Sequence, residues 1–236
     1  MSDEAALLRA IADAPDDIPL RLVYADFCEE NGRDQRAALI RGQCALDPLL
    51  VSADEDGFGV HSDDIRLLST LHFPRRLQED LCAPFRALVD EAAPAFGRGG
   101  MEEPPFQFYA GRGFVEELFV LGIRAFRRFL MAAPGLLGQV PLLSLRVHAA
   151  QDDEDPSGLL DPGDLRTLLR LERIERLLEL DLEDYALDEH AARVLLEEGH
   201  RLRLGSLVLR SHELPQLVIA EIDRRFGAAV EFHIPF

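Results

Sequence analysis

The chain has 236 residues, 47% of them hydrophobic, which suffices for one large domain or two small ones with a buried core. Its 43 acidic and 25 basic residues give a formal net charge of −18, and every basic residue is an arginine. Such a charge repels phosphate backbones, so we expect no nucleic-acid partner. No apolar run approaches the roughly 20 residues that span a membrane, and the N-terminal "MSDEAALLRAI" does not resemble a signal peptide. We therefore expect a cytoplasmic protein with no membrane partner.

The front part of the chain predicts a helical module over residues 1–48. Apolar residues recur in it at helical spacing, and the dipeptide "NG" separates two of the segments. Asp26, in the mostly apolar string "YADF", is expected to stabilise this module by pairing with Arg21 or Arg41. The helices are predicted over residues 3–13, 19–31 and 34–46.

Residues 49–105 predict a linker and a helical connector. The stretch 47–64 is rich in Asp, Gly and Ser, which favours a loop, and helical patterns resume over 64–92. The string "SADEDGFGVHSD" at 52–63 partly matches a calcium-binding loop, but Ser stands at its first ligand position and Asp at its last. We expect a solvated acidic loop here and in "QDDED" at 151–155, while calcium binding at either remains open.

The cysteines and histidines show no spacing typical of a metal site. Cys28, Cys44 and Cys82 are too few for a disulfide framework and are expected to be reduced thiols. The seven histidines form no HExxH or related pattern. His148 and His212 share one position of the repeat described next, which predicts packed turn residues. We expect no cofactor, no metal and no catalytic residue.

A leucine pattern recurs in the second half of the chain. "LLELDL" at 177–182 and "LGSLVL" at 204–209 place leucines at the same positions, 27 residues apart. Alternating apolar residues over such short stretches predict half-buried strands. The same frame fits two earlier segments completely and a terminal strand incompletely. Its inward positions are Val115, Leu118 and Val120, then Val140, Leu143 and Leu145, and finally Ile234 and Phe236.

Each predicted strand is followed by a helical pattern, such as "IRAFRRFLMAAPG" and "LDEHAARVLLEEGH". Before the first repeat, "FQFYAGRGFVEELFVL" predicts two strands around a Gly-Arg-Gly turn, a hairpin. A strand–helix unit of about 20–29 residues is typical of a leucine-rich repeat. One such unit cannot bury both faces, so neighbouring units must stack.

The stretch "DEAALLRAIADAPDDIPLRLVYADFCEENGRDQRAALIRGQCAL" resembles the bacterial repeat-companion domain, most recognisably in "RLVYAD" followed by Phe27. Residues 106–236, with "GRGFVEEL" at their start, are similar to degenerate bacterial leucine-rich repeats. The asparagine usual at the ninth repeat position is missing, so an irregular solenoid is expected. That position holds Ile123, His148, Tyr185 and His212. The resemblance implies protein binding and gives no activity for the companion module.

These patterns predict an α/β protein in which the N-terminal helical module is followed by a short, irregular, leucine-rich-repeat-like solenoid of parallel strands and helices over residues 106–236. The predicted function is non-enzymatic protein binding, as an adaptor or scaffold, through the sheet face of the solenoid. One alternative is a neutraliser or regulator of a single basic partner protein, such as a toxin or an enzyme. A small hydrolase is the alternative we favour least. The oligomeric state stays open.

The residues that point away from the predicted core define the expected binding face. Phe119, Leu121 and Leu142 would form an apolar cluster, which either the helical module covers or a partner meets. Glu179 and Asp181 share no row with an arginine, so their charges are expected to meet a basic partner. A cross-strand row of Arg146, Glu183 and Arg210 is expected beside them. The predicted binding residues are Glu179, Asp181, Glu183, Phe119, Leu121, Leu142, Arg146 and Arg210.

Overall fold

The protein is an α/β chain with a mostly parallel sheet, which confirms the predicted class. The computed structural model describes residues 3–55, 68–69, 73–86, 88, 104–149, 158–211 and 214–233. The chain divides into two compact units. Unit 1 comprises Met1–Ala87, Gln107–Leu118 and Leu136–Leu142, and unit 2 comprises Leu88–Phe106, Phe119–Gly135 and Leu143–Phe236.

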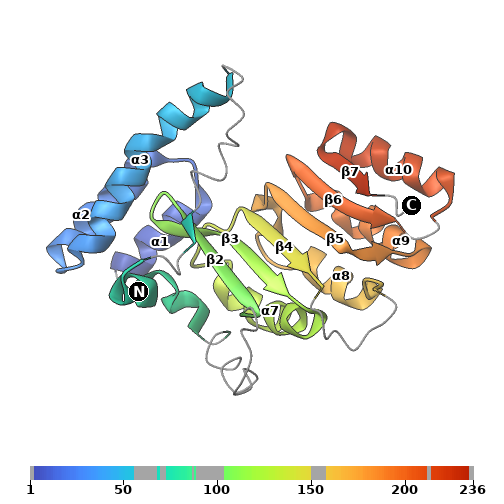
Figure 1. Ribbon diagram of the computed structural model, residues 1–236, viewed down its shortest axis with the longest axis horizontal. Coiled ribbons are helices and arrows are strands. Elements are labelled where there is room, and N and C mark those ends of the chain that lie inside the picture. Colours follow the sequence, from blue (N-terminus) through green and yellow to red (C-terminus); the bar gives the residue numbers. More distant parts are fainter. Residues whose placement is uncertain are drawn as a thin grey trace. The chain divides into compact units, whose positions relative to one another are not determined.

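Unit 1 begins with the three predicted helices, α1 (Asp3–Asp13), α2 (Ile18–Glu30) and α3 (Asp34–Glu55) (Figure 1). The carboxylate of Asp17 caps α2 by accepting a hydrogen bond from the Leu20 amide at 3.1 Å. Helix α3 continues to Glu55, into the segment that its composition had predicted to be a loop. Ala and Leu are good helix formers, and several of them follow residue 46.

The helical module encloses a small core. Asp26 pairs with Arg41 at 2.7 Å, as predicted, but both side chains are largely exposed, so this pair adds little stability. The buried charges of the module are instead Arg21, whose side chain is completely buried, and Arg36, which is 6% exposed. The core residues are Ile11, Tyr24, Ala25, Cys28, Ala37, Ile40, Cys44 and Phe114.

The other described elements of unit 1 are short. Strand β1 (Leu68–Ser69) pairs antiparallel with β2 (Phe106–Gly111), and α5 (Arg75–Leu81) leads into a single 3-10 turn over Ala83–Phe85. The helical pattern predicted over 64–92 is therefore wrong at β1 and correct at α5. The 3-10 turn packs against β2, since the ring centroids of Phe85 and Phe108 lie 4.9 Å apart.

A two-residue turn joins β2 to β3 (Phe114–Leu121), which confirms the predicted hairpin. Arg112 and Gly113 both have positive φ angles, +49° and +83°. Positive φ at both central residues defines the type I′ turn, whose twist matches that of paired strands. The arginine at the first position is unusual, since an L-residue other than glycine, Asn or Asp seldom adopts this conformation.

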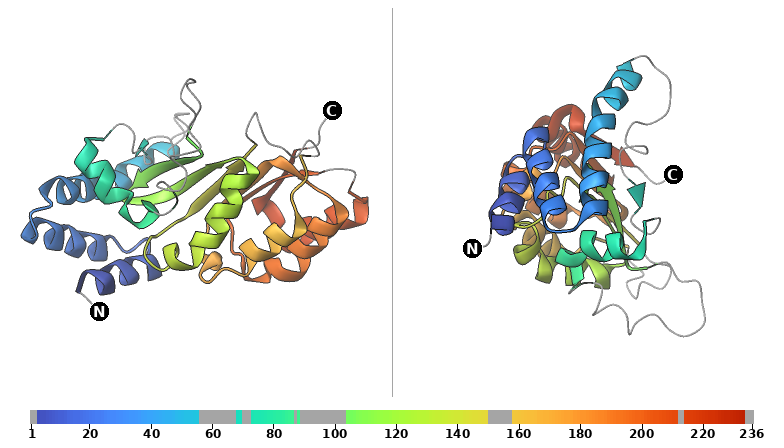
Figure 2. Two further views of the ribbon diagram at one scale, coloured as in Figure 1. Left: turned by 90° about the horizontal axis from the view of Figure 1, so that it is seen from below. Right: turned by 90° about the vertical axis from the view of Figure 1, so that its left-hand side faces the viewer.

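Unit 2 alternates strands and helices along the chain, as the repeat pattern predicted. Its strands β4 to β7 are parallel neighbours in chain order, and its helices lie on one side of them (Figures 1 and 2). The C-terminal part of β3, from Phe119, also belongs to unit 2, and β3 is the neighbour of β4 in the sheet. The elements after β3 are α7 (Ile123–Leu136), β4 (Ser144–His148), α8 (Pro162–Leu169), β5 (Glu179–Leu187), α9 (Glu189–Glu198), β6 (Ser206–Ser211), α10 (Gln216–Phe226) and β7 (Val230–His233).

The predicted 27-residue spacing is correct between β5 and β6. Leu180 pairs with Leu207 and Leu182 with Leu209, and all four side chains are completely buried. The helix stripe of α9 is also buried as predicted, and Asp188 caps that helix by accepting from the Ala191 amide at 2.7 Å. The 27-residue spacing therefore predicted correctly which residues of these two strands point inward and how the strands pair.

The predicted register of β4 and β7 is wrong. The partner of Leu180 in β4 is Leu145 rather than Leu143. Leu143, Leu145 and Val147 share one phase of the strand, so a shift by two residues leaves the apolar alternation unchanged. In β7 the partner of Leu207 is Val230, because β6 lacks the extra residues that the register shift between Leu182 and Ala186 adds to β5 and hence to the 27-residue step. The predicted inward residues Ile234 and Phe236 lie outside the described residues.

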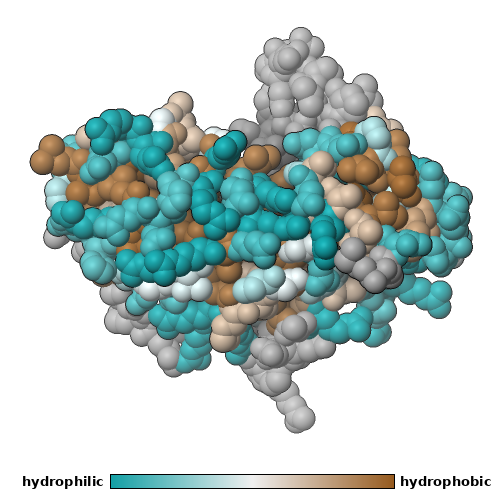
Figure 3. Space-filling model, turned by 180° about the vertical axis from the view of Figure 1, so that it is seen from behind, coloured by the Kyte–Doolittle hydropathy of each residue, from teal (hydrophilic) through white to brown (hydrophobic). Residues whose placement is uncertain are grey.

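Large apolar side chains reach the surface on helices of both units. Figure 3 shows hydrophobic surface, in brown, set among hydrophilic residues on one face of the molecule. Single exposed apolar side chains are normal on soluble proteins, so we give them no functional role. They include Leu22 and Val23 of α2, Leu46 of α3, Met131 of α7 and Leu217 of α10.

Candidate functional site

The candidate site is the face of the unit 2 strands opposite the helices, which we call the open face. Strand alternation assigns its residues, because Leu145 and Val147 of β4 and Leu180 and Leu182 of β5 point into the core. The side chains between them point to the other side. The open face carries Phe119, Leu121, Ser144, Arg146, His148, Glu179, Asp181, Glu183, Ser206, Val208 and Arg210.

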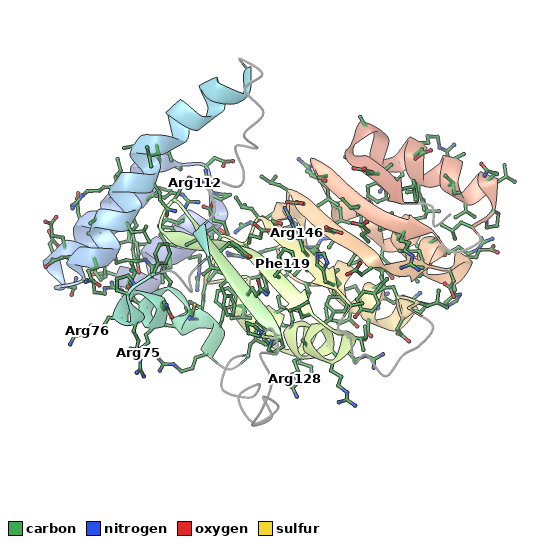
Figure 4. The ribbon with its side chains drawn as sticks, viewed as in Figure 1. Arg75, Arg76, Arg112, Phe119, Arg128 and Arg146 are labelled. Carbon is green, nitrogen blue, oxygen red and sulfur yellow. The ribbon has the colours of Figure 1, made fainter. Side chains whose placement is uncertain are left out.

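Phe119 forms the apolar centre of this face, but it is not bare. Its ring stacks on the His148 imidazole with centroids 4.5 Å apart and planes 12° apart. The Arg146 guanidinium carbon lies 5.7 Å from the same ring, a cation–π distance (Figure 4). Phe119 and Leu121 are half-buried, and the predicted third member of their cluster, Leu142, is only 3% exposed. The predicted exposed apolar cluster is therefore wrong for Leu142.

Glu179 is not the unpaired acid that the repeat frame predicted. Its carboxylate lies 3.1 Å from Arg146 and accepts a hydrogen bond from the Ser144 hydroxyl at 3.0 Å. The cause is the shifted register of β4, which places Ser144 directly beside Glu179. The Arg146 and Glu179 side chains remain 31% and 28% exposed, so a partner can still contact the pair.

Asp181 is the register partner of Arg146 in β4 and Val208 in β6. It is only 9% exposed, and its Oδ1 accepts a hydrogen bond from the Glu183 amide at 2.9 Å. A carboxylate in this position shapes the strand and offers little surface to a partner. The prediction of a free Asp181 charge is therefore wrong.

The predicted row of Arg146, Glu183 and Arg210 is not formed. The pairing of β5 with β6 shifts between Leu182 and Ala186, so Arg210 lies opposite Ala186. This irregularity is a β-bulge, which leaves extra residues of one strand without a counterpart in the next. Glu183 lies in the bulge and is half-buried.

The bulge builds a contact that the sequence patterns missed. Asp184 Oδ2 lies 3.0 Å from His148 Nδ1 and accepts a hydrogen bond from the Ala149 amide at 3.1 Å. The Tyr185 hydroxyl donates to the His148 carbonyl oxygen at 3.4 Å, and the Gly122 amide donates to the same oxygen at 2.7 Å. Tyr185 and His148 hold the repeat position where asparagine was expected, and this substitution was the one signal in the sequence.

The open face carries more acid than base. The carboxylates that reach its surface are Glu179, Glu183 and Asp184, against the guanidiniums of Arg146 and Arg210, whereas Asp181 is nearly buried. His148 Nε2 and Arg210 Nε are buried and have no hydrogen-bond partner among the described residues. A surface that offers carboxylates around an aromatic ring suits a partner with basic side chains.

Among the residues that the structure describes, three or more His, Cys, Asp or Glu side chains do not come together in an arrangement that could hold a metal ion. No helix in the described ranges combines the length and the apolar character needed to cross a membrane. His212 and the acidic stretch 151–155 lie outside the described residues, as does most of the calcium-like string at 52–63, whose first four residues belong to α3.

The fold and the open face define an α/β protein with strand–helix alternation. No protein-family model matches the chain, and no curated protein or solved structure matches it either. We therefore infer the function from the geometry of the molecule itself.

Proposed function

We propose that the chain is a non-enzymatic protein-binding protein, an adaptor or scaffold, that contacts its partner with the open face of unit 2. The observation that carries the proposal is the group formed by Phe119, Arg146, His148 and Glu179 on adjacent strands. Aromatic and arginine side chains dominate the binding energy of protein interfaces, and strands hold them in fixed positions.

We also propose that unit 2 is a short, irregular solenoid of the leucine-rich-repeat kind and that α1–α3 form a module of the repeat-companion kind. The strand–helix alternation and the 27-residue spacing of Leu180 with Leu207 support the first part. The sequence resemblance supports the second. Solenoids of this kind use their exposed sheet for binding, which agrees with the choice of the open face.

A basic partner, such as a toxin or an enzyme that the chain neutralises, is the specific form we favour. The net charge of −18 and the excess of carboxylates on the open face support it. Complementary charge raises association rates at low salt and suppresses partners of like charge. Binding should therefore weaken as the salt concentration rises.

The test compares two variants of the full chain as bait for proteins of the native host. Phe119→Ala combined with Arg146→Ala removes the centre of the open face. Arg128→Ala is the matched control, since Figure 4 shows this arginine projecting from α7, away from the strands. The proposal predicts a protein that wild type and control retain and the double variant loses, with all three chains equally folded. Equal retention by all three would reject the open face.

A further inference from the structure

The tip of the β2–β3 hairpin is held in unit 1 by side chains of α2 and α3. The Gln43 amide makes two hydrogen bonds with the tip backbone: it donates to the Ala110 carbonyl at 2.9 Å and accepts from the Gly113 amide at 2.6 Å. Arg21 Nη1 donates to the Arg112 carbonyl at 3.3 Å. These contacts depend on the turn conformation and on main-chain groups.

The space around the tip admits only glycine at its second turn position. A Cβ atom on Gly113 would lie 2.1 Å from Ile40 Cγ1 and 2.9 Å from the Ile40 Cα. The positive φ of Gly113 also strains any L side chain. Helix α3 thus selects glycine at this position by contact as well as by conformation.

The next residue of the tip enters the module core. The Phe114 ring lies 5.3 Å from the Tyr24 ring, and the guanidiniums of Arg21 and Arg36 lie 5.1 and 5.2 Å from it. Phe114 is only 2% exposed. An aromatic side chain held between rings and cations at such distances is a specific anchor.

A buried ion pair completes the contact. Glu116 of β3 lies 2.6 Å from Arg21, and the two side chains are 6% and 0% exposed. Arg21 is already positioned by the helical module, because its Nε donates to the Pro15 carbonyl at 2.8 Å. Burial raises the pKa of Glu116, and the charges of Arg21 and Arg112 oppose that shift. Arginine without its carboxylate would remain buried and unpaired, which is costly.

These four contacts join residues 15–43 to residues 110–116, and they resemble a receptor with its ligand. The helices provide a positioned guanidinium, a bridging amide and a shaped apolar site. The hairpin provides a positive-φ turn, glycine, an aromatic ring and an acid in fixed order. The contacts themselves do not require that both sides belong to one molecule, and identical elements can exchange between copies of a chain.

We propose that α1–α3 form a receptor for the hairpin tip Gly111–Glu116, and that this receptor accepts the tip of a second copy of the chain when its own tip is withdrawn. The site lies in unit 1 and is independent of the open face. The partner of the helical module is thus a type I′ hairpin with the sequence Gly-Arg-Gly-Phe, an aromatic anchor and an acid two residues later.

The test uses the full chain with Gly113→Val, whose own tip cannot occupy the receptor. The probe is a labelled synthetic peptide of residues 104–122, which carries the tip, and its binding is measured by fluorescence anisotropy. The wild-type peptide is expected to bind the Gly113→Val chain at least about tenfold more tightly than it binds the wild-type chain, whose own tip competes. It should also bind the Gly113→Val chain at least about tenfold more tightly than a peptide that itself carries Gly113→Val does. Adding Gln43→Ala to the receptor chain removes both of its hydrogen bonds to the tip and should weaken binding by at least about tenfold.

Circular dichroism shows whether the Gly113→Val chain keeps its helices, so that misfolding can be told apart from loss of binding. If the variant loses helicity, the wild-type peptide should restore it and the Gly113→Val peptide should not. Helicity that saturating wild-type peptide fails to restore would overturn the proposal, because the tip would then be an inseparable part of one core. A folded variant that binds both peptides equally would overturn it as well.

Discussion

The two units place their charges differently. In unit 1 the ion pair of Arg21 and Glu116 lies in the interior, whereas in unit 2 the pair of Arg146 and Glu179 lies at the surface and the interior beneath it is leucine. Burial makes the first pair strongly dependent on its partner and leaves the second screened by water. Unit 1 thus contains buried polar contacts that require specific partners, and unit 2 obtains its regularity from repeated apolar ones.

Removing the buried guanidinium should give the largest effect. Arg21→Ala removes one of the two guanidiniums that pair with buried Glu116, since Arg112 remains 3.2 Å from the carboxylate, and it should lower the free energy of unfolding by at most about 3–5 kcal/mol. Arg41→Ala is the matched control at an exposed pair with Asp26, and it should cost much less, because water screens an exposed pair. Urea unfolding followed by circular dichroism measures both.

A second step sharpens this prediction. Arg21→Met combined with Glu116→Leu removes both charges, and it should be more stable than Arg21→Ala alone. If the double variant is as unstable as the single one, the ion pair is not the reason for the cost. The hydrogen bonds of Arg21 to the Pro15 and Arg112 carbonyls would then carry it.

The stability of unit 2 should fall strongly when a buried leucine is replaced and only slightly when a charged residue of the open face is replaced. Leu180→Ala or Leu207→Ala removes completely buried methyl groups and should cost about 2–5 kcal/mol through lost burial and a cavity. Glu179→Ala, beside them on the open face, should cost less than about 1 kcal/mol, because its ion pair is partly exposed. Equal costs at the two kinds of position would contradict the assignment of inward and outward faces.

Helix caps should give smaller and equal effects in the two units, because a cap is a local interaction. Asp17 caps α2 in unit 1 and Asp188 caps α9 in unit 2, each through one backbone amide. Replacement by Ala should cost about 1 kcal/mol at either site, and replacement by Asn should retain most of the stability. Thermal unfolding of the four variants checks this, and an Asn variant as unstable as its Ala counterpart would exclude the capping role.

The smallest effect concerns alkaline pH and unit 1. Burial raises the pKa of the Cys28 thiol, so the unfolded chain ionises at a lower pH than the folded one. The stability linked to this thiol is complete below the unfolded pKa of about 8.5 and is lost as the pH rises toward the folded value. Unfolding in urea at about pH 7 and about pH 9.5 should show a smaller pH dependence in Cys28→Ala than in wild type.

Thiol labelling provides an independent check on the same burial. Cys28 and Cys44 are buried, whereas Cys82 is partly exposed. A thiol reagent should modify Cys82 first in the native chain. Faster modification of Cys28 would mean that the core of the helical module opens readily.

Local patterns determined much of this protein. Helical spacing predicted α1 and α2, alternation predicted the inward leucines of β5 and β6, and their common spacing predicted how these strands pair. The Gly-Arg-Gly string predicted the hairpin, since only a tight turn fits between two adjacent strand patterns. These features depend on neighbours close in sequence, which is why the sequence sufficed.

Which strands and side chains contact one another was decided by the tertiary structure alone. Alternation defines which face a residue occupies but not the register between neighbouring strands. The 27-residue frame therefore assigned the wrong partners to β4 and β7. A bulge after Leu182 then brought Asp184 to His148, and a shifted β4 gave Glu179 its arginine. Arg21 contacts the Arg112 carbonyl across 91 residues of chain, and no local pattern relates residues so far apart. Burial and packing select such contacts only when the whole chain is folded.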